Sequence, residues 1–140
     1  MTIKVSHPTG DVPDPICRKI MRSIVDAEVI YVAFPRFQHA LVVDLRRGGV
    51  DAPTMLLTKL ELTTAQQAAT VQRLRPTGPT LRRFASVAWG GSTRAFADQG
   101  VLPAILNRLP TEHTSDAMAV FEQLRDAERT TTTRVPNLAR

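Results

Sequence analysis

The sequence predicts a single α/β domain built on a four-strand mixed sheet, and three observations lead to this fold class. β-branched and apolar runs of strand length occupy residues 29–34, 39–45 and 54–61, with short turn segments between them. Capping residues followed by apolar positions at three- and four-residue spacing predict helices before and after these runs. A fourth apolar run, over 81–89, follows a helical segment. The expected order is therefore helix, three strands, helix, strand and three helices.

The N-terminal half is expected to hold an irregular arm, a helix and three strands. Residues 1–13 mix prolines and glycine with polar residues and show no period. Asp14 and Pro15 supply a capping side chain and a proline at the first helical position, so a helix is expected over 14–27. Its core-facing stripe is expected to comprise Ile16, Ile20, Met21, Ile24 and Val25. The loops between the next three strands are so short that they favour an antiparallel three-strand meander.

The C-terminal half is expected to add one strand and four helices. Threonines followed by glutamine three residues later predict a capping box that opens a helix over 63–74. The strand at 81–89 then needs a crossover and a parallel partner, although a helical turn is an alternative there. Three helices are expected beyond it, over 92–99, 101–109 and 111–129. Residues 130–140 are expected to form a flexible tail, which limits the domain to 14–129.

Composition excludes several classes of protein. The chain has 140 residues, 43% hydrophobic residues and one cysteine, Cys17, so neither an intramolecular disulfide nor a cysteine-based zinc site is expected. No apolar run reaches the roughly 18 residues that cross a bilayer, and the first residues lack both a basic leader and an apolar signal core. We expect no cofactor, no metal, no membrane segment and a cytoplasmic location.

The positive charge is concentrated in one segment, residues 73–108. The chain carries a formal net charge of +5, and this window holds six arginines against one acid, Asp98. Arginine clusters attract phosphate and carboxylate groups through their field and their bidentate geometry. We therefore expect a non-enzymatic binding or regulatory module that contacts nucleic acid or a phosphate-bearing ligand through this segment. A solvated face that only keeps the protein soluble is the alternative.

A turn at Gly90 and Gly91, which we call the glycine turn, lies inside the basic segment, between the expected strand at 81–89 and the next helix. Backbone N–H groups at such a turn and at a helix N-terminus favour an anion. The expected anion-binding residues are Arg73, Arg75, Arg82, Arg83, Gly90, Gly91, Ser92, Thr93 and Arg94. The turn matches neither a Walker loop nor a dinucleotide-binding fingerprint, and an ordinary turn with a helix cap is the alternative.

The order of helix, three-strand meander, helix and strand over residues 14–89 resembles the common core of the restriction-endonuclease-like nucleases. In that family an acid on the second strand and an acid-x-Lys pair on the third hold a divalent metal for phosphodiester hydrolysis. Asp44 and Lys59 stand on the corresponding strands, and Glu28 is an optional third acid, but leucine occupies the position two before the lysine. Glu61 lies two residues after Lys59. The resemblance thus implies an alternative function, a metal-dependent phosphodiesterase with a displaced site at Asp44, Lys59 and Glu61.

The remaining candidates give weaker patterns. Cys17 is expected to be a packed thiol, and none of the three histidines stands at metal-ligand spacing. Phe37 and Trp89 are the aromatic residues that an edge could present to a nucleic-acid base. The last helix has a narrow apolar face built partly from alanines, which is expected to pack within the monomer. A homodimer, as in a structural homo-oligomer subunit, is the alternative for that face.

Overall fold

The computed structural model describes residues 14–46, 55–74 and 80–138 of the chain. Its sheet has the order β3-β2-β1-β4 and consists of β1 (Val29–Phe34), β2 (His39–Asp44), β3 (Met55–Lys59) and β4 (Phe84–Ala88). The pairs β1/β2 and β2/β3 are antiparallel, whereas β1/β4 is parallel. This arrangement confirms the predicted α/β fold, in which a three-strand meander is joined by one parallel strand.

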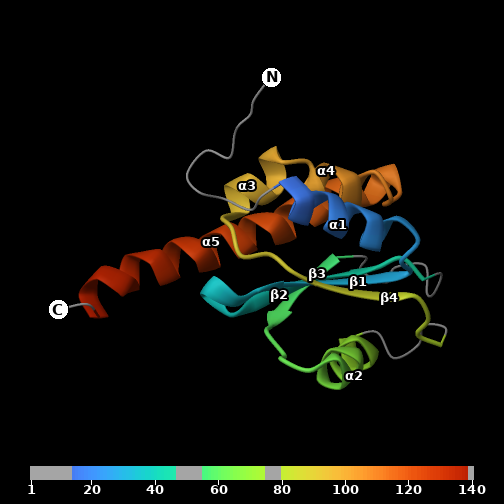
Figure 1. The fold of residues 1–140 in the computed structure, drawn as a ribbon, viewed down its shortest axis with the longest axis horizontal. Coiled ribbons are helices and arrows are strands. Elements are labelled where there is room, and N and C mark those ends of the chain that lie inside the picture. Colours follow the sequence, from blue (N-terminus) through green and yellow to red (C-terminus); the bar gives the residue numbers. More distant parts are fainter. Residues whose placement is uncertain (1–13, 47–54, 75–79, 139–140) are drawn as a thin grey trace.

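Helices cover both faces of the sheet (Figure 1). One face carries α1 (Asp14–Val25), α3 (Thr93–Asp98), α4 (Val101–Leu106) and α5 (Thr114–Leu138). The opposite face of the described sheet carries α2 (Thr64–Leu74). Two short 3-10 turns, η2 (Pro35–Phe37) and η3 (Thr111–His113), complete the described elements. The helix order confirms the sequence prediction, and the sheet forms the middle of three layers.

The central strand β1 is buried at all six positions because a helical layer covers each of its faces. Successive strand residues point to opposite faces. Ile30, Val32 and Phe34 accordingly join the larger core under α1, α3, α4 and α5. The alternate positions of β1 pack into a smaller core on the side of α2, together with Val71 of that helix.

The buried face of α1 differs from the predicted stripe at two positions. Ile20 and Ile24 are buried as expected, but Ile16 and Val25 are 45% and 64% exposed. Cys17 takes the core-facing place that the sequence assigned to Ile16, and its thiol donates to Gln99 Oε1 at 2.8 Å. Residues 17, 20 and 24 are spaced by three and four, so they share one face that Ile16 and Val25 only flank.

Both aromatic residues expected at an edge are buried, so that expectation was wrong. Phe37 is 3% exposed and stacks on Phe34 with ring centroids 5.4 Å apart. Trp89 is fully buried, packs edge-to-face on Phe96 and donates its indole N–H to the Ser92 carbonyl at 2.9 Å. Their rings therefore stabilise the core and its junction with α3.

The last helix is longer than predicted. The sequence places its end near Arg129, before a flexible tail, whereas α5 continues to Leu138. Threonines are weak helix formers, but a helix that is already nucleated gains one hydrogen bond for each further residue, so it can continue through them. The predicted arm, residues 1–13, lies outside the described residues. In the part of the chain that the structure describes, no helix combines the length and apolarity needed to cross a membrane.

Candidate anion-binding site

The strand order brings three strand ends together at one end of the sheet: the end of β2, the start of β1 and the start of β4. β2 runs antiparallel to β1, so the end of β2 lies beside the start of β1. β4 runs parallel to β1, so the start of β4 lies at the same end of the sheet. Glu28 precedes β1, Arg46 follows β2, and Arg82 and Arg83 precede β4. The topology therefore gathers charged residues that are far apart in sequence.

Arg83 links the start of β4 to the residue before β1. Its φ of 46° lies in the left-handed region, which is costly for a residue other than glycine. Its carbonyl accepts a hydrogen bond from the Glu28 N–H at 3.0 Å, and its Nη2 lies 3.0 Å from Glu28 Oε2. These two contacts offset the backbone strain. The side chain of Arg83 remains 59% exposed.

Arg82 stands next to Arg83 and is exposed. The ion pairs within the described residues do not include Arg82, so no carboxylate among them neutralises this guanidinium. A guanidinium carries five N–H donors in a planar fork that matches phosphate and carboxylate. Of the arginines at this end of the sheet, Arg82 is thus the most available to a ligand.

Arg108, which follows α4, holds the C-terminal end of α1. Its Nη1 donates to the carbonyl of Ile24 at 2.7 Å and to the carbonyl of Ala27 at 2.6 Å. The last carbonyls of a helix lack intrahelical partners, and the helix dipole favours a cation there. This contact fixes the Arg108 guanidinium at the same end of the sheet.

Arg46 forms a buried fork with Asp44. Its Nε donates to Asp44 Oδ1 at 2.9 Å and its Nη2 to Oδ2 at 2.7 Å, and both side chains are 1% exposed. The backbone N–H of Arg46 also donates to Oδ1, at 3.0 Å. Hydrogen bonding to Asp44 raises the pKa of Arg46 above its ordinary value, and the charges of Asp44 and Glu28 add to this. The Arg46 guanidinium therefore stays protonated.

These side chains surround a cavity of about 600 Å³, which we call the arginine pocket. Its lining consists of Glu28, Leu45, Arg46, Thr80, Arg82, Arg83 and Arg108. This lining contains four arginines and one glutamate, so positive charge prevails around the pocket at neutral pH. Its volume falls in the range typical of small-molecule sites. The arrangement can bind an anionic group through charge and several N–H donors at once.

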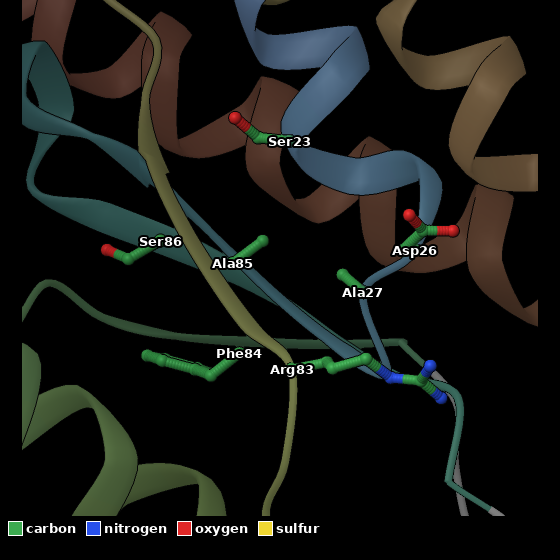
Figure 2. A pocket seen from close by; sticks show the side chains of 7 residues that line it. All are labelled: Ser23, Asp26, Ala27, Arg83, Phe84, Ala85 and Ser86. Carbon is green, nitrogen blue, oxygen red and sulfur yellow. The ribbon is translucent and has the colours of Figure 1, made fainter.

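A second cavity, of about 390 Å³, adjoins the arginine pocket through Arg83, and we call it the edge groove. It lies between Ser23 of α1 and Asp26, which directly follows that helix, on one side and residues 83–86 on the other (Figure 2). Arg83 and Ala85 point to the same side of the strand, whereas Phe84 and Ser86 point to the other side. The hydroxyl of Ser86 donates to Oε1 of Gln67 on α2 at 2.6 Å.

The glycine turn, also predicted to bind an anion, lies at the opposite end of β4. Ser92 caps α3, because its hydroxyl accepts the N–H of Ala95 at 3.0 Å. The carboxylate of Glu128 on α5 accepts the Thr93 N–H at 3.3 Å and the Thr93 hydroxyl at 2.5 Å. Two donors of Thr93 that the sequence suggested for a phosphate are therefore already bonded to a carboxylate of the protein itself.

Two of the other predicted anion-binding arginines, Arg73 and Arg94, lie away from the arginine pocket. Arg73 is on α2, and its Nη2 donates to the Thr70 hydroxyl at 3.0 Å. Arg94 lies on α3, is 88% exposed and pairs with Asp98 at 3.4 Å. Arg75 lies outside the described residues. Within the described chain, the basic segment is thus divided among three places, and Arg82, Arg83 and Arg108 share one of them.

The three residues of the nuclease alternative do not come together. Lys59 pairs with His39 at the start of β2, whereas Asp44 is at the end of that strand. Five residue steps of about 3.4 Å separate these positions by about 17 Å. Glu61 lies near Lys59, where its N–H donates to the Tyr31 hydroxyl at 2.8 Å. The described residues contain no cluster of three or more His, Cys, Asp or Glu side chains suited to a metal ion.

Among the charged residues that line the pocket, sequence reasoning missed two arginines and one acid. Arg108 lies in the basic segment but is not among the predicted site residues, and Arg46 belongs to no predicted site. Glu28 entered only as an optional metal ligand of the nuclease alternative. One signal was available, because an arginine two residues after a strand-ending aspartate can fold back to form a fork. That these residues meet at one end of the sheet follows only from the position of β4 beside β1.

Comparisons with protein-family models, with curated proteins and with solved structures found no match to this chain.

Proposed function

We propose that this protein is a binding module that holds a phosphate-bearing ligand in the arginine pocket. The observation that carries the proposal is the presence of four arginines, from three separate parts of the chain, in the lining of one cavity of about 600 Å³. Arginine forks match phosphate oxygens in geometry, and several of them share the charge of a polyanion. Arg82 contributes most because it has no ion-pair partner among the described residues.

Glu28 makes the two exposed arginines of the pocket unequal. Its carboxylate pairs with Arg83 while its own side chain is 29% exposed. A phosphate at the pocket mouth would compete with this carboxylate for Arg83, whereas Arg82 has no such competitor within the described chain. Binding should therefore depend on Arg82 more than on Arg83.

Isothermal titration calorimetry with inorganic pyrophosphate tests the proposal. We expect wild-type protein to bind at low salt and to lose affinity as salt rises, because the interaction is electrostatic. Arg82→Ala should weaken binding by about tenfold or more, the effect of one lost charge-assisted hydrogen bond. Arg94→Ala is the matched control, since Arg94 is exposed and belongs to α3. Equal affinity of both variants, or no binding at low salt, would contradict the proposal.

A further inference from the structure

β4 is an edge strand of the described sheet, and its outward backbone groups take part in no strand pairing among the described residues. The Arg83 carbonyl and the Trp89 N–H, at the two ends of β4, both bond to the β1 segment. Successive residues of a strand direct their peptide groups to opposite edges, so Phe84, Ser86 and Ala88 direct theirs away from β1. Among the described strands, β4 pairs with β1 alone. Its outer side is therefore an open edge of the kind that accepts an added strand.

The open edge leads into the arginine pocket. The edge groove runs beside residues 83–86 and shares Arg83 with the arginine pocket. Ser86 and Ala88, two of the residues whose peptide groups point outward, are exposed. A strand added along β4 would thus extend towards the arginines that line the pocket. One ligand can occupy both cavities if it has an extended backbone and one anionic side chain.

A peptide fits this pair of cavities better than a nucleic acid does. The carboxylate of Asp26 lines the edge groove and would repel a phosphodiester backbone. Base stacking needs exposed aromatic faces, but Phe37 and Trp89 are buried. A peptide backbone instead supplies alternating N–H and C=O groups that can pair with the outward C=O and N–H groups of β4. Its charge can be confined to a single side chain at the pocket.

We propose that the phosphate-bearing ligand is an extended peptide segment of a partner protein, which adds as a strand to β4 and places a phosphorylated side chain in the arginine pocket. This inference rests on the proposed function of the pocket and adds to it the class of ligand. A phosphorylated side chain carries nearly two negative charges and three acceptor oxygens, which suits several guanidinium groups. The strand pairing supplies affinity through the main chain, and the pocket selects the phosphorylated residue.

Fluorescence anisotropy of the full chain with a labelled peptide tests the inference. The peptide alternates threonine and valine and carries one phosphoserine, and a series of variants is N-methylated at single residues. N-methylation at every second residue should weaken binding by roughly fivefold or more, because each of those methyl groups removes one hydrogen bond to β4. N-methylation at the intervening residues should have little effect. This two-residue period identifies strand addition independently of any change in the protein.

A protein variant tests the same edge from the other side. Ala88→Pro removes an outward N–H that β1 does not use, and Ala88→Val is the control that keeps it. We expect the proline variant to weaken peptide binding by roughly fivefold or more and to leave pyrophosphate binding unchanged. Thermal unfolding of both variants checks the fold. Should Ala88→Pro fail to fold, the N-methylated series still decides.

Other outcomes would overturn the inference in distinguishable ways. Absence of the two-residue period with intact, Arg82-dependent pyrophosphate binding would refute strand addition and leave the pocket function standing. Loss of pyrophosphate binding as well would refute both proposals. Tight binding of single-stranded RNA that is unaffected by Ala88→Pro would assign the pocket to nucleic acid. A dimer in sedimentation that Ala88→Pro dissolves would show that a second copy occupies the edge.

Discussion

Arginines with the same charge have different tasks in this protein, and their contacts separate these tasks. Arg46 is buried in a fork with Asp44, and Arg108 holds the end of α1. Arg83 shares its charge with Glu28, while Arg82 is exposed and has no ion pair within the described residues. Two of the four pocket arginines are therefore already used by the fold, and they form a rigid frame around the two more exposed ones.

The Asp44–Arg46 fork predicts a large loss of stability when one partner is neutralised. Asp44→Asn leaves the Arg46 guanidinium buried opposite a neutral group, so we expect the free energy of unfolding to fall by about 3 kcal/mol. Urea denaturation measures this. Asp98→Asn breaks the exposed pair with Arg94 and serves as the control, with an expected change below about 0.5 kcal/mol. Similar losses in both variants would show that the fork is not a structural pair.

Tyr31 predicts a loss of stability at alkaline pH. Burial raises the pKa of Tyr31 above its ordinary value, although the hydrogen bond from the Glu61 backbone acts against this. The folded chain therefore holds the phenolic proton more tightly than the unfolded chain. This stabilisation is complete below the unfolded pKa of about 10 and is lost as pH rises through the folded pKa.

Tyr31→Phe tests this assignment. Urea denaturation between neutral pH and pH of about 11 should show a steeper alkaline loss of stability in wild-type protein than in the variant. At neutral pH the variant should lose about 1 kcal/mol, because its phenyl ring cannot accept the Glu61 N–H. The same alkaline slope in both proteins would mean that another group titrates there.

At the scale of elements, local sequence patterns were sufficient to predict that an element exists and whether it is a helix or a strand. The β-branched run at 29–34 coincides with β1, and the capping box at Thr63 precedes α2, with the Gln66 N–H donating to the Thr63 hydroxyl at 3.1 Å. Element ends were less predictable. The 81–89 run forms a strand only over Phe84–Ala88, because Arg83 turns into the left-handed region before it. The sequence marks no glycine there, so local propensity gave no sign of that bend.

The contact between α3 and α5 predicts another measurable loss of stability. Glu128→Ala removes the carboxylate that accepts both the N–H and the hydroxyl of Thr93, a residue that is 2% exposed. We expect the free energy of unfolding to fall by about 2 kcal/mol, the range for hydrogen bonds to a charged group. Glu122→Ala affects an exposed pair with Arg125 on the same helix and should cost less than about 0.5 kcal/mol. Equal losses in chemical denaturation would contradict the assignment.

At the scale of the whole molecule, strand order decided which candidate residues meet. In an antiparallel meander, consecutive strands finish at opposite ends of the sheet. Asp44 and Lys59 finish consecutive strands, so the predicted topology already separates them. The convergence of Arg46 with Arg82 was different. It depends on β4 lying beside β1, and the sequence indicated a parallel partner for that strand without identifying which one. Sequence position alone grouped Arg82 with Arg94, although β4 places them at opposite ends.

The central claim is that a phosphate group binds in the arginine pocket and not at the glycine turn. The most direct test records the Nε–Hε resonances of the arginine side chains by NMR while inorganic pyrophosphate is added to the full chain. We predict saturable shifts of Arg82 and Arg83 with little change at Arg94. Shifts confined to Arg94 and the backbone of Ser92 and Thr93, or no saturable shift of any arginine, would contradict the account.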